Sequence, residues 1–446
     1  MNQRNPAISK GIDWRLVGLY LLIVGIGITA IFGATYVEGD SVITSFLTFK
    51  TDYSKQFIFF ILSVIIGVFI LVTDSKFFAA TANLWYAFGI LLLLLVFPFH
   101  TEIKGTESII RIGGFQFQPA EFCKIPVCLA LAKYLSLNET DFSKTKSQLI
   151  AAAIAILPAI LTILQKETGL ALVYFSFFLV MYREGLPAII LIIGFSVAAL
   201  VVLTLLLEKN TLAIILTVFA GLTAYSMRRQ IKRNKGLLIN IVLLWALCVG
   251  IQRFGVPFIF KNVLQNHQVE RIYSTIGKEV PVEYLKGYDA SAASSGPRMN
   301  TADYNVKQSK IAIGSGRFLG RGLLKGTQTR YDFVPEQRTD FIFCTIGEGF
   351  GFVGSMVLII VYLALLFLII TVAERQRSTF SRCYAYGVAG VLFFHIGINL
   401  AMTIGLAPVI GIPLPFVSYG GTSLLTFSIL LFILIRVDAD RQMVIR

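Results

Sequence analysis

The stretch VGSMVLIIVYLALLFLIITVA (353–373) runs for 21 residues without a charged side chain. A helix of about 20 apolar residues crosses the hydrocarbon core of a bilayer, so this stretch predicts a transmembrane helix. Similar runs recur along the chain, and only 14% of its 446 residues are charged, against about 25% in a soluble domain. The sequence therefore indicates an all-α polytopic membrane protein. It disfavours a cytosolic enzyme, a disulfide-rich secreted domain and a disordered chain.

Twelve apolar runs are expected to form transmembrane helices. They cover residues 16–35, 57–73, 77–98, 119–135, 148–164, 169–182, 188–207, 212–227, 237–256, 341–372, 384–403 and 418–436. The runs 119–135 and 169–182 are short, and the first contains Lys124. An even number of spans puts both termini on the same side of the membrane.

The distribution of Lys and Arg predicts the orientation, because short cytoplasmic loops carry an excess of both. The strongest basic block is MRRQIKRNK (227–235), between the runs 212–227 and 237–256. With the N-terminus inside, this block and most other basic loops lie on the inner side. We therefore expect both termini in the cytoplasm.

Residues 257–340 are expected to form one long loop on the outer side. From Arg253 to Asp340 the chain holds thirteen Lys or Arg against eight Asp or Glu. A basic, glycine-rich loop beside the membrane could hold an anionic headgroup, and a solvated loop without a specific partner is the alternative. The loop lacks the GxxxxGK[ST] order of a nucleotide-binding loop, and no nucleic-acid partner is expected.

Asp340 stands at the start of the run 341–372, two residues after Arg338. Ionisable groups at membrane depth are costly and indicate function. A carboxylate in a partly apolar rim can serve as a general base. The alternative is an acid at a helix N-terminus that only interacts with the helix dipole.

Two other segments place unusual residues in or beside the membrane. FQPAEFCK (117–124) puts Glu121 and Lys124 on one face of a helix, either as functional groups or as a buried structural ion pair.

The stretch GLAPVIGIPLPFVSYGGTS (405–423) is too rich in Pro and Gly for an uninterrupted span. Irregular backbone at this depth is tolerated where it lines a cavity or is buried in protein. We expect a substrate groove or a packed re-entrant bend there.

Three long motifs resemble the SEDS family of shape, elongation, division and sporulation proteins. They are QSKIAIGSG (308–316), GTQTRYDFVPEQRTDFIF (326–343) and PLPFVSYGGTS (413–423), and the resemblance covers nearly the whole chain. The GTQ at 326–328 is similar to the RodA branch, with the FtsW division branch as the alternative. Family members typically have ten spans, so the resemblance implies a single membrane domain over 1–446 with an added hairpin at 212–256. Arg317 stands where the family pattern has glycine.

The resemblance implies a peptidoglycan glycosyltransferase that polymerises lipid II on the outer face of the bacterial cytoplasmic membrane during cell elongation. It implies a class B penicillin-binding protein, the elongation machinery and membrane lipids as partners. The essential acid of the family corresponds to Asp340, and its Glu and Lys on the fourth span correspond to Glu121 and Lys124. Further substrate-binding candidates in these motifs are Gln308, Ser309, Lys310, Gln328, Glu336, Arg338, Ser418 and Tyr419.

This chemistry needs a base and a partner for an anionic leaving group. Asp340 would accept the proton of the attacking sugar hydroxyl. Charge developing on the lipid pyrophosphate would be met by Lys124, Arg338 or Lys310, or by a divalent cation such as Mg or Mn. No metal site and no other cofactor are identified.

Two other functions fit a membrane protein of this family. One is a lipid II transporter (a flippase), and the other is a non-catalytic scaffold for the penicillin-binding protein. A carboxylate at the outer rim favours the enzyme, because transporters place their key charges near the bilayer midplane.

Overall fold

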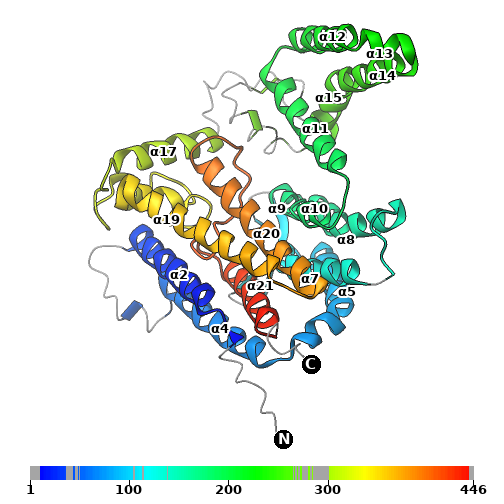
Figure 1. Cartoon of the computed structure of the whole chain (residues 1–446). Helices are drawn as coiled ribbons and strands as arrows, with labels where there is room; N and C mark the ends of the chain where they lie inside the picture. The colour runs from blue at the N-terminus through cyan, green and yellow to red at the C-terminus, as the bar shows by residue number, and fades with distance from the viewer. Residues whose placement is uncertain are drawn as a thin grey trace, which may run out of the picture. The chain divides into compact units, whose positions relative to one another are not determined.

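The structure is a computed structural model of the whole chain, and it is mostly helical (Figure 1). It describes residues 11–36, 44, 45, 49, 51–103, 106–112, 115–137, 139–264, 266, 269, 272, 273, 280, 281, 284 and 301–440. The segment 280–303, which looks longer than in the family that the sequence resembles, lies mostly outside these residues.

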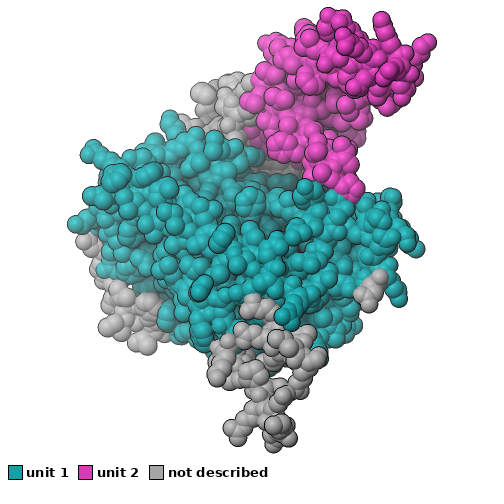
Figure 2. All heavy atoms as spheres, viewed as in Figure 1, with its two compact units in different colours: residues 1–186, 305–446 teal, residues 187–304 magenta. Residues whose placement is uncertain are grey.

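The chain divides into two compact units, which Figure 2 shows in different colours. The first unit comprises residues 1–186 and 305–446, and the second comprises residues 187–304. The sequence predicts one membrane domain with a hairpin at 212–256. The second unit contains that hairpin together with the predicted span before it.

The first unit holds the helices that surround the candidate site. They are α2 (Trp14–Thr35), α4 (Asp52–Val72), α5 (Ser75–Phe99), α6 (Pro119–Phe122), α7 (Lys124–Ser136), α8 (Thr145–Leu164), α9 (Thr168–Tyr174), α10 (Phe177–Arg183), α17 (Thr301–Ser315, beginning in the second unit), α18 (Thr327–Arg330), α19 (Ile342–Glu374), α20 (Thr379–Thr403) and α21 (Gly421–Ala439).

The second unit holds α11 (Ala188–Leu206), α12 (Lys209–Ser226), α13 (Arg228–Arg233), α14 (Gly236–Gly250) and α15 (Val256–Phe258), with π-helical turns at Ile251–Gly255 and Ile259–Val263. Helical structure continues to Val263, seven residues past the predicted end of the span at 256. Pro257 lies inside this continuous helical segment, between the two π-helical turns.

Each of the twelve predicted runs is helical, which confirms a polytopic all-α membrane protein. Within the described part of the chain, nine helical segments are long and apolar enough to cross a membrane. The other three runs form shorter helices: α6 with α7, α9 with α10, and α12. Two of these correspond to the runs that are short in the sequence.

The two most buried spans lie at the centre of the first unit. In the most apolar 18-residue stretch of each helix, 89% of the residues of α21 and 61% of those of α20 are buried. The helix α21 packs against α4, while α20 packs against α19 and α7. Close approach depends on small residues, as is usual between membrane helices. A methyl group on Gly67 of α4 would lie 2.5 Å from the Phe432 ring of α21.

The Pro- and Gly-rich stretch between α20 and α21 is not helical, as its composition predicts. Residues 404–420 form turns and extended backbone that pack against the helices. The Tyr362 hydroxyl of α19 donates to the carbonyl of Pro415. On the other side, a methyl on Gly27 of α2 would lie 2.7 Å from Val417 Cα. In this stretch, here called the re-entrant segment (404–420), residues 412 and 414–418 are buried in protein, where irregular backbone is tolerated.

A small antiparallel sheet that the sequence analysis does not predict lies before α6. It consists of β1 (Thr101–Ile103), β2 (Thr106–Ile112) and β3 (Phe115–Phe117), in the order β1-β2-β3. The Ser108 hydroxyl donates to Glu167 Oε2 at 2.8 Å, and the Lys166 ammonium pairs with Glu107. The strands therefore join the turn between α8 and α9, where Glu167 is only 9% exposed.

The long loop contains the helices α17 and α18. The backbone between these two helices binds α19 close to a break in that helix. Gly351 in α19 has a φ of +65°, which interrupts the helix. Backbone N–H groups of Arg321 and Gly322 donate to the carbonyls of Glu348 and Gly349, at 3.0 and 2.9 Å. Arg317, in the place of the family's glycine, has a φ of +51°, a left-handed conformation that favours glycine.

Candidate active site

Asp340 lies in a turn that directly precedes α19. The turn begins at Glu336, whose φ is +59°, and its carbonyl accepts from the N–H groups of Thr339 and Phe341 at 3.0 and 3.1 Å. The Thr339 hydroxyl donates to Glu336 Oε2 at 2.9 Å. These bonds give the turn 336–341 a defined backbone. It is here called the catalytic turn because it holds Asp340, the candidate general base.

The backbone of Asp340 is bound to α20 and its side chain faces the re-entrant segment. Asn399 Nδ2 donates to the Asp340 carbonyl at 2.8 Å and to the Ile412 carbonyl at 2.7 Å. A methyl on Gly411 would lie 3.4 Å from Asp340 Oδ2, in ordinary contact with the carboxylate. Gly411 has a φ of +72°, which favours glycine at this position. The single Asn399 amide therefore orients both segments.

Two hydrogen bonds hold the end of the re-entrant segment on the catalytic turn, and an ion pair joins the turn to α4. The Tyr419 N–H donates to the Arg338 carbonyl at 2.8 Å. The Ser418 hydroxyl donates to the Thr339 carbonyl at 2.6 Å. The Arg338 guanidinium, which is 55% exposed, pairs with Asp52 at the start of α4. Segments almost 80 residues apart in the chain thus form one surface.

Tyr419 stays a neutral hydrogen-bonding group in this surface. Burial and the neighbouring Asp52 carboxylate raise the pKa of the Tyr419 phenol to about 12. The hydroxyl is therefore protonated at neutral pH and can donate a hydrogen bond.

Glu121 and Lys124 form a fully enclosed ion pair below the site. Their side chains are 1% and 0% exposed, and Lys124 Nζ lies 2.6 Å from Glu121 Oε2. The same ammonium lies 2.7 Å from His395 Nε2 and 5.2 Å from the centroid of the Phe427 ring. His395 Nδ1 lies 3.2 Å from the Pro413 carbonyl. The pair thus contacts α20, α21 and, through His395, the re-entrant segment.

The remaining predicted site residues fall into two groups. Ser309 and Ser418 are 0% and 3% exposed, and the Ser309 hydroxyl donates to the Thr403 carbonyl at 2.9 Å. Both hydroxyls therefore hold backbone in place. Gln308, Gln328 and Glu336 are partly exposed, and Lys310 is exposed with its ammonium beside Gly405.

Glu348 is a site residue that the sequence analysis misses. It is 0% exposed, and its carboxylate accepts from the N–H groups of Gln328 and Thr329 at 2.9 and 2.8 Å. Gln337 Nε2 in turn donates to the Thr329 carbonyl at 2.7 Å. Glu348 thus fixes the start of α18 and, through Gln337, the catalytic turn. Its position as an acid within an apolar span was the signal that could have identified it.

An apolar groove opens beside the catalytic turn. It has a volume of about 310 Å³ and is lined by α17, α19 and α20. Phe343, Phe352 and Leu400 contribute apolar walls, and Arg317 contributes the one charged side chain among its lining residues. Phe343 lies three residues after Asp340 in the chain, and Leu400 directly follows Asn399.

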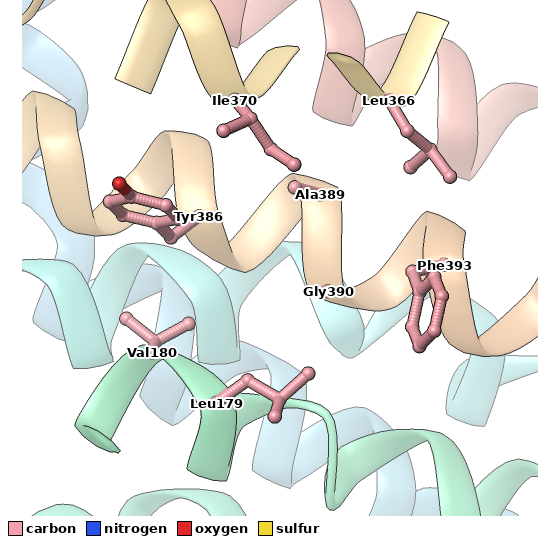
Figure 3. Close-up of a pocket in the computed structure, with 8 residues that line it drawn as sticks. All are labelled: Leu179, Val180, Leu366, Ile370, Tyr386, Ala389, Gly390 and Phe393. Carbon is pink, nitrogen blue, oxygen red and sulfur yellow. The ribbon is translucent and has the colours of Figure 1, made fainter. Parts of the chain in front are cut away.

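A second hollow, of about 170 Å³, lies between α10, α19 and α20 (Figure 3). Leu366 and Ile370 of α19 face Phe393 and Tyr386 of α20 across it, and Leu179 and Val180 of α10 complete its wall. Its lining residues include no acid and no base. Its one hydroxyl, that of Tyr386, donates to the Glu374 carboxylate.

The described residues form no cluster of three or more His, Cys, Asp or Glu side chains that could hold a metal ion. The site combines the partly exposed carboxylates of Asp340 and Glu336, exposed basic side chains and an apolar groove. This set of groups can deprotonate a hydroxyl and bind an amphipathic anion.

The chain matches the FtsW/RodA/SpoVE family of cell cycle proteins over residues 14–218 and 289–443. It is 30% identical over 452 aligned residues to the peptidoglycan glycosyltransferase RodA of Treponema pallidum, with 96% of this chain and 97% of the relative covered. It is 28% identical to the peptidoglycan glycosyltransferase MrdB of Escherichia coli K12, with 80% and 78% covered.

Solved structures share the fold. The crystal structure of the rod shape determining protein RodA of Thermus thermophilus matches with a TM-score of 0.59 and 22% identity, covering 96% of this chain and 97% of that chain. A chain of the structure described as "Structural coordination of polymerization and crosslinking by a peptidoglycan synthase complex" matches with a TM-score of 0.63 and 22% identity, covering 96% and 98%.

Removing one partner of the buried ion pair is expected to destabilise the protein. Lys124→Met leaves the Glu121 carboxylate buried without its cation and should cost about 3–5 kcal/mol, whereas Lys124→Met with Glu121→Leu should recover most of that loss. Thermal unfolding in detergent measures both. The exposed Lys144–Asp141 pair, 3.4 Å apart, is the control, and Lys144→Met should cost less than about 1 kcal/mol. Equal losses in Lys124→Met and Lys144→Met would contradict the enclosed pair.

Proposed function

The chain belongs to the FtsW/RodA/SpoVE family of cell cycle proteins, and from this we propose that Asp340 is the general base of its reaction. The protein is a multi-pass membrane peptidoglycan glycosyltransferase of the RodA type, with a role in cell elongation. The observation that carries the proposal is the position of Asp340, a partly exposed carboxylate held in a fixed turn beside a basic surface and an apolar groove.

We propose lipid II, a disaccharide peptide on a polyprenyl pyrophosphate, as the substrate. The 4-hydroxyl oxygen of the acceptor sugar forms a bond to C1 of the donor, and the bond from C1 to the pyrophosphate oxygen breaks. The hydroxyl proton passes to the Asp340 carboxylate. An α-linked donor then gives a β-linked product in one displacement, so no covalent intermediate on the protein is needed.

Exposed basic residues are the better partners for the pyrophosphate. Lys124 is enclosed between Glu121 and His395, so we propose that it positions the site and does not touch the leaving group. Arg338 and Arg317 are exposed at the catalytic turn and at the groove. Guanidinium groups match phosphate oxygens in geometry as well as in charge. Lys310 is a third exposed cation, next to the re-entrant segment.

The apolar groove suits the beginning of the polyprenyl chain. Its walls are Phe, Leu, Ile and Met side chains, and Arg317 lies among them. A lipid pyrophosphate is complementary to this lining, because its anionic pyrophosphate is joined directly to a hydrocarbon chain. The described protein residues offer no complete cation site, and no step of this mechanism is assigned to a metal.

The partners and the orientation follow the family. We propose that the catalytic turn lies on the outer face of the cytoplasmic membrane and that both termini lie inside, because the basic block 227–235 favours the cytoplasm. We also propose a class B penicillin-binding protein as a partner within the elongation machinery. A related chain is part of a peptidoglycan synthase complex, which supports this.

The base assignment predicts the effect of an isosteric change. Asp340→Asn should lower the rate of lipid II polymerisation by about 10²–10⁴, because the amide cannot accept the proton. Polymer formed by the purified protein with its penicillin-binding partner is separated on gels and quantified. Asp141→Asn, in an exposed loop, is the control and should retain the rate. Equal polymer from Asp340→Asn and the wild type would support the scaffold alternative.

The groove assignment predicts a binding defect when the groove is filled. Gly314 of α17 lines the groove and a Cβ there has no neighbour within 4 Å, so Gly314→Leu adds a bulky side chain at the groove without a backbone clash. The KM for lipid II should rise about tenfold or more, since burial of several CH₂ groups at about 0.8 kcal/mol each is lost. Gly397→Leu on α20, also without a neighbour within 4 Å, is the control. An unchanged KM in Gly314→Leu would rule out the groove as the lipid site.

A further inference from the structure

The hairpin α12–α13–α14 carries a one-sided charge that the glycosyltransferase reaction does not use. From Lys209 to Val269 the chain contains eight Lys or Arg and no Asp or Glu. Five of these basic residues gather at the turn of the hairpin: Arg228, Arg229, Lys232, Arg233 and Lys235. The family match ends at residue 218 and resumes at 289, so it leaves out this turn and the second helix of the hairpin.

The basic side chains of the turn are all exposed. Within the described part of the chain, none of the five forms an ion pair, in contrast to Arg183, Arg375 and Arg382 of the first unit, which all do. Arg228 instead lies over the ring of Tyr225, with the guanidinium carbon 4.6 Å from the ring centroid. Tyr225 is 65% exposed at the end of α12. Tyr and Arg at a helix end are typical of the bilayer interface.

The two helices beside the turn present hydrocarbon to their surroundings. Phe219 and Leu222 of α12 are 70% and 62% exposed, and Leu243 and Leu244 of α14 are 62% and 63% exposed. The 18 residues of α12 span about 27 Å at about 1.5 Å per residue, close to the hydrocarbon thickness of about 30 Å. Trp245 Nε1 donates to Thr217 Oγ1 at 3.1 Å, which joins the two helices.

We propose that the turn 227–235 binds the headgroups of acidic phospholipids in one leaflet. The apolar helices α12 and α14 place this turn at the level of the headgroups. There, unpaired guanidinium and ammonium groups meet phosphate oxygens and the net negative charge of the lipid. Zwitterionic lipids carry no net charge, so this attraction selects the acidic ones.

The test uses the full-length protein extracted from membranes of phosphatidylcholine and phosphatidylglycerol in equal parts. Native mass spectrometry counts the retained molecules of each lipid. In the variant R228Q/R229Q/K232Q/R233Q, the ratio of phosphatidylglycerol to phosphatidylcholine should fall about tenfold or more, since each basic residue near the surface contributes about 1 kcal/mol. Glutamine is a good helix former, so α13 is expected to fold.

A matched variant controls for the loss of positive charge in general. K76Q/K144Q/K146Q/R377Q removes four exposed basic residues of the first unit and should leave the lipid ratio within about twofold of the wild type. Equal losses in both variants, or no loss in either, would overturn the proposal. Displacement of phosphatidylglycerol by an equal concentration of inorganic phosphate would also overturn it, because the turn would then be a site for free phosphate.

Discussion

The side-chain amide of Asn399 is the interaction on which the candidate site depends. Asn399 is fully buried in α20, and its Nδ2 donates to the carbonyls of Asp340 and Ile412. Each carbonyl belongs to a segment without regular structure, which has no helix or strand ladder to hold it. A buried carbonyl without a donor costs about 1–3 kcal/mol. The catalytic turn and the re-entrant segment are therefore positioned together by one side chain.

The same helix positions the buried charges. His395 lies four residues before Asn399, about one helical turn, and its ring lies between the Lys124 ammonium and the Pro413 carbonyl. Three backbone carbonyls of the site thus contact side chains on one face of α20. Since Lys124 and Glu121 are enclosed there, the basic groups that remain exposed near Asp340 are left to meet an anionic substrate. The basic residues at the hairpin turn of the second unit suit different anions, the headgroups of acidic phospholipids.

The sequence predicts the spans, the irregular stretch before α21 and the position of Asp340 at the mouth of α19, because these follow from local composition. It does not predict that Asn399, His395 and Glu348 contact the site. Their partners lie in other segments, and an Asn or a His in an apolar run has no distinctive local pattern. Nor does it predict the strands β1 to β3, because a short sheet between spans gives a weak periodic signal. Ser309 and Ser418 belong to the recognised motifs, yet their buried hydroxyls hold backbone, which only tertiary structure reveals.

The most direct test is the rate of lipid II polymerisation by Asn399→Leu, a substitution of similar size, measured per folded molecule with the partner present. Because two buried carbonyls lose their donor, the account predicts that kcat falls about tenfold or more while KM changes little. Wild-type kcat in a correctly folded Asn399→Leu protein would contradict it, because the position of Asp340 would then not depend on α20.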